Sequence, residues 1–145
     1  MNKQFQKLLV VWFALLMSTG IYFLFTRFAA PGVVYEPVSA TNRLLIVALA
    51  VLAVFLILAS FFVRRRFLAR SIDEQNVLLV HQGHTFAWAM CEVSATLGVI
   101  ERFAIGYREY YLLMLLAAIG IAVQFPKREH LLAATYKTST DKASF

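Results

Sequence analysis

The sequence contains few of the residues that hold a small secreted domain together or give an extended chain its solubility. It has one cysteine, three prolines and six glycines, and only 15% of its 145 residues are charged. A single cysteine cannot form an internal disulfide, which excludes a disulfide scaffold. The low charge excludes a disordered chain, because such chains combine low hydrophobicity with high net charge.

The sequence is instead rich in apolar side chains. Apolar residues make up 61% of it and aromatic residues 14%, and the mean hydropathy is +0.70. Soluble domains contain about 45–50% apolar residues. A domain of this length leaves much of its surface exposed and cannot bury such an excess. The composition therefore predicts an integral membrane protein, with the lipid bilayer as its first partner.

The net charge of +6 is also typical of proteins that bind nucleic acids. Here, however, the basic residues lie beside apolar runs, where they act as topology signals next to anionic lipid head groups. We therefore expect no nucleic-acid partner.

Four apolar segments are candidate membrane spans, at about 8–25, 44–63, 84–104 and 110–125. The first two carry no charge and reach about 27–30 Å as helices, the thickness of a bilayer core. The third contains Glu92, and the short fourth ends at Pro126. We expect an all-α integral membrane protein, an antiparallel bundle of four transmembrane helices. Residues 1–130 would form the single membrane domain, and 131–145 a polar cytoplasmic tail.

Two features near the spans allow further expectations. Lys3 and Lys7 before an apolar run also describe a signal peptide, but this run is longer than the roughly 7–15 apolar residues of such peptides. We therefore expect the first segment to remain as a membrane helix.

Between the second and third spans, Ser71 or Asp73 is expected to cap a short interfacial helix.

The distribution of Lys and Arg predicts the orientation. With four crossings, one side of the membrane holds most of the basic residues, and the positive-inside rule makes that side cytoplasmic. Both termini are then cytoplasmic, and a bacterial inner (plasma) membrane is the expected location. The richer side has Lys3, Lys7, Arg64, Arg65, Arg66, Arg70, Lys127, Arg128, Lys137 and Lys142; the other has Arg27, Arg43, Arg102 and Arg108.

Glu92 is the most informative residue, because it lies midway between Gly83 and Glu101, about 13 Å from each on a helix. An ionised carboxylate near the bilayer centre costs at least a few kcal/mol. At 100° per residue, the polar residues that share its face continue toward one membrane surface. This pattern indicates either a proton or cation site or an intramembrane hydrogen bond that fixes packing. The candidate residues are Glu92, Thr96, Thr85 and His81.

Small residues form a second stripe on the third span, beside the polar one. Such residues let membrane helices approach closely. The predicted packing residues are Ala87, Cys91, Ser94 and Gly98, with Ala118 and Ala122 as counterparts on the fourth span.

No residue pattern indicates an enzyme or a cofactor site. His81 and His84 are three residues apart and His130 lies on the same expected side, but no carboxylate or thiolate completes a ligand set. A haem held by two histidines would need them on facing helices at greater depth. We expect interfacial histidines with no metal and no cofactor. We find no nucleophile elbow, phosphate-binding glycine loop or catalytic carboxylate pair, so we expect no enzyme activity.

The stretch from Met90 to Ile100, MCEVSATLGVI, resembles the ion-carrying helix of the rotor-ring c subunits of rotary ATPases. The resemblance implies that Glu92 carries a proton or sodium ion and that Gly98 is a close-packing glycine. Two fused hairpins are likewise similar to the doubled c subunits of vacuolar-type enzymes. The first and fourth spans lack that family's glycine-rich helix. The general form, four helices with an acidic third span, also resembles small bacterial membrane proteins.

Two functions follow as hypotheses. In the first, the protein is a small subunit or assembly partner of a larger membrane complex, or forms a homo-oligomer. In the second, Glu92 takes part in translocation of a proton or cation.

Overall fold

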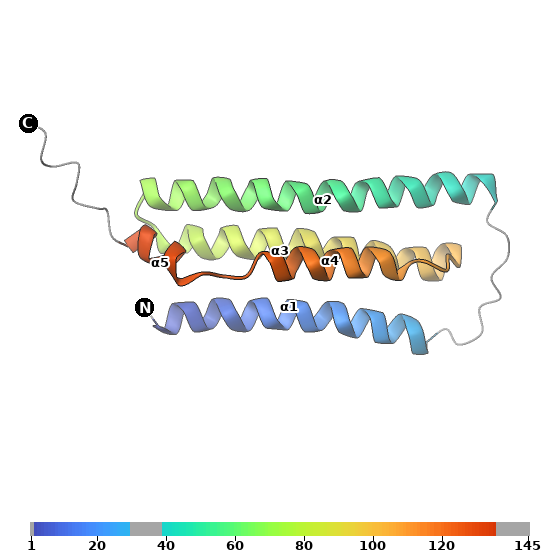
Figure 1. The fold of residues 1–145 in the computed structure, drawn as a ribbon, viewed down its shortest axis with the longest axis horizontal. Helices are drawn as coiled ribbons and strands as arrows, with labels where there is room; N and C mark the ends of the chain where they lie inside the picture. Colours follow the sequence, from blue (N-terminus) through green and yellow to red (C-terminus); the bar gives the residue numbers. More distant parts are fainter. Residues whose placement is uncertain (1, 30–38, 136–145) are drawn as a thin grey trace, which may run out of the picture.

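A computed structural model describes residues 2–29 and 39–135, and every regular element in these ranges is helical. The elements are α1 (Asn2–Phe28), α2 (Ala40–Asp73), α3 (Val77–Ile100), the π-helical turn η1 (Glu101–Ile105), α4 (Tyr111–Val123) and α5 (Arg128–Thr135). The long helices run side by side, with α1 and α2 at opposite edges and α3 and α4 between them (Figure 1). The expected all-α class is confirmed for the described part of the chain.

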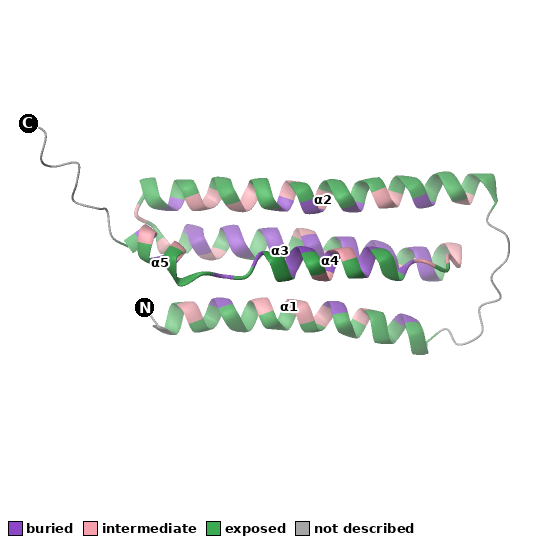
Figure 2. Cartoon of the chain, in the orientation of Figure 1, coloured by how far each residue is buried: buried purple, intermediate pink, exposed green. Residues whose placement is uncertain are grey.

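α3 is the central helix of the molecule, since it packs against α1, α2, α4 and α5. Buried residues are concentrated on α3 and α4, whereas the outer faces of α1 and α2 are exposed (Figure 2). The exposed residues on those faces are large and apolar, and an apolar surface of this extent indicates contact with lipid or protein. Examples are Val10, Phe13, Ile21, Leu44, Val51, Phe55, Leu58 and Phe62.

Two described helices, α1 and α2, are each long and apolar enough to cross a membrane. α4 and α5 provide a third crossing if this pair, bent by 48°, is one span. α3 is long enough to cross a membrane, but its apolar sequence is interrupted by the polar residues Gln82, His84 and Glu92. The structure thus supports two or three of the four expected membrane-crossing helices.

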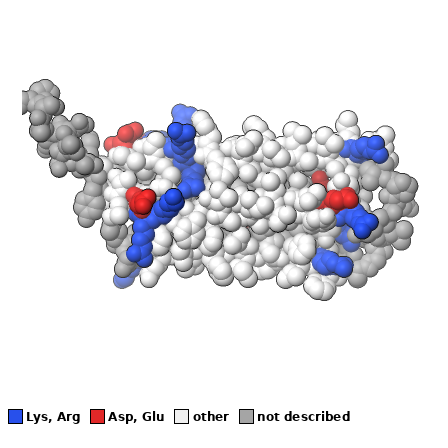
Figure 3. Space-filling view, in the orientation of Figure 1, with Lys and Arg blue, Asp and Glu red and all other residues white. Residues whose placement is uncertain are grey.

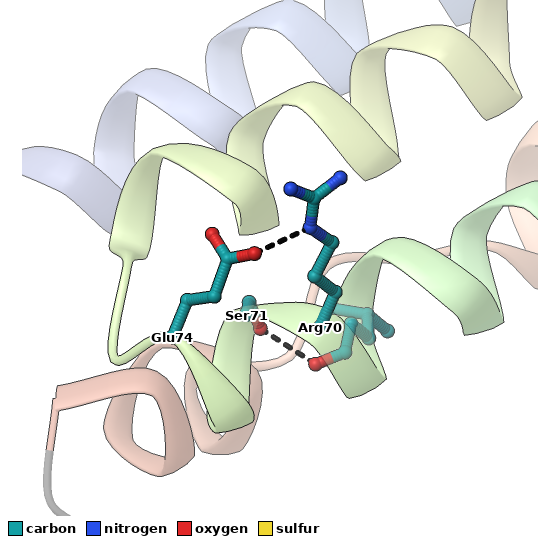
Figure 4. A network of polar contacts seen from close by, with 4 residues as sticks. Arg70, Ser71 and Glu74 are labelled. Carbon is teal, nitrogen blue, oxygen red and sulfur yellow. Dashed lines mark hydrogen bonds and ion pairs between the residues drawn. The ribbon is translucent and has the colours of Figure 1, made fainter.

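The turn between α2 and α3 differs from the expected interfacial helix. Ser71 lies inside α2, where its hydroxyl donates to the carbonyl of Leu68 at 2.6 Å, and the exposed Arg70 pairs with Glu74 (Figure 4). The cap of α3 is Asn76, whose Oδ1 accepts the backbone N–H of Leu78 at 2.9 Å. The second apolar segment was predicted to end at 63, but α2 continues ten residues further, to Asp73. The basic residues after 63 thus belong to the same helix and not to a separate interfacial one.

The connection from α3 to α4 is a π-helical turn that ends at Gly106. The φ angle of Gly106, 71°, lies in the left-handed region, which glycine adopts without strain. The backbone N–H of Tyr107 then returns to the carbonyl of Glu101 at 3.1 Å. The π-helical turn ends at Ile105, close to residue 104, where the sequence predicts the end of the third apolar segment, and α4 begins at Tyr111.

Two tryptophans satisfy carbonyl groups at the end of α4. Trp12 Nε1 donates to the carbonyl of Ile121 at 2.9 Å, and Trp88 Nε1 donates to that of Gln124 at 3.2 Å. The last carbonyls of a helix have no partner within it, and Pro126 prevents its continuation. The indoles of α1 and α3 therefore hold the end of α4 against these two helices.

Beyond Pro126 the chain forms α5, which includes the first described residues of the expected polar tail. Leu131 and Ala134 are buried against Val80 of α3. This apolar contact keeps 131–135 on the bundle, and the tail residues 136–145, with Lys137 and Lys142, lie outside the described ranges.

Charged side chains gather at the two ends of the molecule and leave a band without them between, on the face that Figure 3 shows. One end contains the start of α1, the end of α2 and α5, and the other contains the end of α1, the start of α2 and η1. Charged side chains of the described residues therefore lie mainly toward the two ends of the helices on this face.

Candidate functional site

Glu92 accepts a hydrogen bond from α1. The Oγ of Ser18 donates to Oε1 of Glu92 at 2.6 Å, and both side chains are half-buried. A carboxyl group in an apolar surrounding is stabilised by such a donor, and this one joins helices far apart in the sequence. Ser18 did not stand out in the sequence, because serine is common in membrane helices and nothing in its spacing points to Glu92.

The other residues of the predicted polar stripe do not converge on the Glu92 carboxyl. Thr96 is exposed and its hydroxyl donates to the backbone carbonyl of Glu92 at 3.2 Å. Thr85 is exposed, and His81 is half-buried near the start of α3. The structure therefore places these groups along one helix, with one direct side-chain contact to Glu92, from α1.

Together these residues give α3 an outward polar face. Gln82, Thr85 and Thr96 are exposed and Glu92 is partly exposed, while the same helix buries Ala87, Cys91 and Ala95 completely on its other side. We call Gln82, Thr85, Glu92 and Thr96 the α3 polar face. The other exposed residues between Gln82 and Thr96 are apolar: Phe86, Ala89 and Val93.

The small residues of α3 form the buried contact with α2 and α4. The predicted packing residues Ala87, Cys91, Ser94 and Gly98 are all buried. A Cβ on Gly98 would lie 2.9 Å from the carbonyl oxygen of Tyr110. On α4 the close approach is made by Ala117 and Gly120, both buried, while Ala118 is half-buried beside α1 and Ala122 is exposed.

A buried polar network joins α2, α3 and the end of α4. Gln124 Nε2 donates to Ser60 Oγ at 2.7 Å and lies 3.5 Å from Cys91 Sγ. Ser60 in turn donates to the carbonyl of Ile57 at 2.6 Å. All three side chains are fully buried. Ser60 is the only polar residue of its predicted span, and this was the one sequence signal for the network.

Histidines and Arg64 form a second polar cluster toward the α5 end. The His84 ring lies 5.1 Å from that of Trp88 and 5.5 Å from that of His130. His84 is fully buried, and neither of its ring nitrogens has a hydrogen-bond partner. Burial, with the charge of Lys7 as a smaller cause, lowers the pKa of His81, which lies ahead of the expected third span. In the ranges that the structure describes, no three metal-binding side chains come together.

Comparisons with known protein families, with curated proteins and with solved structures give no match. The fold and its polar residues define a class: a helical protein with two or three candidate membrane helices and a polar face on the central helix.

Proposed function

We propose that the protein is an assembly subunit of a membrane complex, bound to a partner membrane protein or to a second copy through the α3 polar face. The observation that carries the proposal is the exposure of Thr85 and Thr96 on either side of Glu92. In a bilayer, polar groups are buried against protein or line water, because lipid offers them no hydrogen-bond partner. A partner helix with polar side chains would supply bonds to Glu92 and Thr85; the Thr96 hydroxyl already donates to the backbone carbonyl of Glu92.

The proposal includes a membrane topology of four crossings. The third span, at about 84–104, would reach about 31 Å at a helical rise, and α4 would be extended to the head groups by Tyr107, Tyr110 and Tyr111. Both termini would be cytoplasmic in a bacterial plasma membrane, with the end that carries Arg64 to Arg70 facing the cytoplasm. Support comes from the grouping of basic residues at the two ends. Nothing in this role requires catalysis, a cofactor or nucleic acid.

The assembly proposal is tested on protein extracted from its own membrane in a mild detergent. Wild-type protein is expected in a discrete complex larger than one chain by native mass spectrometry. Glu92→Leu should shift it to the monomer, because it removes the central hydrogen-bonding group of the face. Val93→Leu is the matched control, since Val93 is the exposed neighbour of Glu92. A wild-type monomer without partner, at native expression, would overturn the proposal.

A second candidate function is proton or cation translocation by Glu92. The observation that favours it is the half-buried carboxyl, which accepts a hydrogen bond of 2.6 Å from a neutral hydroxyl. Such a carboxyl is able to exchange a proton or bind a cation if water reaches it. It differs from the assembly role in needing ionisation, whereas assembly needs hydrogen bonding alone.

The substitutions Glu92→Gln and Glu92→Leu separate the two functions. Glutamine retains the size and hydrogen bonds of the side chain and removes its ionisable proton, while leucine removes both. If Glu92→Gln preserves both the complex and its ion flux and Glu92→Leu destroys both, translocation by Glu92 is excluded. If Gln preserves the complex but abolishes ion flux into vesicles containing the purified complex, the ionisable carboxyl is required.

A further inference from the structure

A basic cavity lies at the η1 end of the molecule. Its volume is about 710 Å³, and among the residues that the structure describes its lining combines three guanidinium groups with three aromatic rings and no acidic side chain: Phe23, Arg27, Arg102, Arg108, Tyr110 and Tyr111. The Arg102 guanidinium is held 5.3 Å from the centre of the Tyr110 ring. Glu101 and Glu109 belong to the same end of the chain but do not line the cavity.

An apolar groove of about 390 Å³ adjoins this cavity between α1 and α4. The two share Phe23 and Tyr111 in their linings, so the groove begins where the basic cavity ends. The other lining residues are Leu16, Thr19, Gly20, Met114, Leu115 and Ala118. Thr19, the only polar side chain among these six, donates its hydroxyl to the carbonyl of Leu15 and offers no free donor to the groove.

The chemistry of the combined site is that of an amphiphile with an anionic head. Arginine binds phosphate oxygens through paired N–H groups, so three arginines around one cavity suit the phosphate of an anionic head group. Tyrosine and arginine are also the side chains that occupy the head-group layer beside an apolar helix end. A free anion would use the cavity alone and would leave the adjoining groove without a role.

We propose that this end of the molecule binds an anionic phospholipid, with its phosphate among Arg27, Arg102 and Arg108 and one acyl chain in the groove between α1 and α4. No residue of the α3 polar face lines the cavity or the groove. Lipid binding therefore goes beyond the proposed assembly function, and either can fail without the other.

The test measures lipid binding by the full chain in a neutral detergent, by native mass spectrometry. Phosphatidylglycerol is expected to bind about tenfold more tightly than phosphatidylcholine of the same chain length. The double variant Arg27→Gln/Arg108→Gln should remove that preference; both residues are exposed, so the fold tolerates the change. Arg43→Gln is the matched control, because Arg43 is an exposed arginine at the same end outside the cavity.

The groove is tested with Gly20→Leu, since a Cβ at Gly20 meets no atom within 4 Å and a larger side chain would occupy the groove. This variant should weaken phosphatidylglycerol binding about tenfold. Ala118→Leu fills the groove from α4 and serves if Gly20→Leu fails to fold. Ala14→Leu, at an exposed position of α1 outside the groove, should bind as the wild type does.

Two results would overturn the proposal. One is equal binding of the two lipids, or an equal loss in Arg43→Gln and in the double variant. The other is full competition by inorganic phosphate together with unchanged binding in both groove variants, which would identify a site for a free anion.

Discussion

Ser18 Oγ lies 2.6 Å from Glu92 Oε1 and donates a hydrogen bond to it, so the carboxyl of the third expected span is held by a hydroxyl on the first. This contact explains how the chain accommodates an acidic side chain among apolar helices. It also leaves Glu92 partly exposed on the α3 polar face, where a further donor from another helix is able to reach it.

The hydrogen bond between Ser18 and Glu92 should stabilise the packing of α1 on α3. In a double-mutant cycle of Ser18→Ala and Glu92→Leu, we expect a coupling energy of about 1 kcal/mol, the size measured for hydrogen bonds between membrane helices. The free energies of unfolding are measured in one detergent for the four proteins. A coupling energy of zero within error would show that the contact contributes nothing to stability.

Glycines at two positions should respond in opposite ways to alanine. Gly98→Ala should destabilise the protein by about 1–3 kcal/mol, because the new methyl group would lie 2.9 Å from the backbone oxygen of Tyr110. Gly20→Ala is the control: it meets nothing within 4 Å and should stabilise α1 by up to about 1 kcal/mol through helix propensity. Thermal unfolding distinguishes them. Equal effects would mean that α3 and α4 are not in close contact.

The thiol of Cys91 should be inaccessible in the folded protein. It is fully buried, and it contacts Ser60 and Gln124 at 3.5 Å. We expect a membrane-permeant maleimide to label it only after unfolding, because burial protects the thiol and disfavours the reactive thiolate. Labelling is followed by mass spectrometry, with a cysteine at the exposed position Ala14 as the positive control. Rapid labelling of native Cys91 would contradict the buried network.

The fold was predictable where it depends on apolar periodicity and residue size. Long apolar runs predicted four of the five described α-helices but not α5, and the small stripe that contains Cys91 and Gly98 is the buried side of α3. The packing residues of α4 were harder to predict from the sequence. Ala117 and Gly120 are separated from the predicted Ala118 and Ala122 only by a rotation about the helix axis, and this rotation depends on where α4 begins. The turn at Gly106 sets that start, and no pattern in the sequence revealed it.

The polar contacts were harder to predict than the helices. Ser18, Gln124 and the two tryptophan donors bond across large separations in the sequence, so no local spacing connects them. Glu92 could be singled out because one acidic side chain among apolar neighbours is costly wherever it lies. Its partner could not, because that depends on how α1 is rotated against α3.

His81 should titrate below its ordinary pKa of 6.5, because burial, and to a smaller extent the charge of Lys7, lowers its pKa. The fold then favours neutral His81, so its contribution to stability is complete above pH 6.5 and is lost as the pH falls below that value. NMR titration of the His81 ring measures the midpoint directly. In Lys7→Gln the midpoint should rise while staying below 6.5. A wild-type midpoint at or above 6.5 would contradict the burial of this ring.

The central claim, that the α3 polar face binds another membrane helix, is tested most directly by a photo-crosslinking residue at Thr96 in native membranes. We expect a discrete adduct, either of twice the mass of the chain or with one partner, that disappears when Glu92→Leu is added. The same probe at Leu58, on the exposed apolar face of α2, should yield no protein adduct. If the Thr96 probe reacts with lipid alone, or if Leu58 gives the same adduct, the α3 polar face is not an assembly surface.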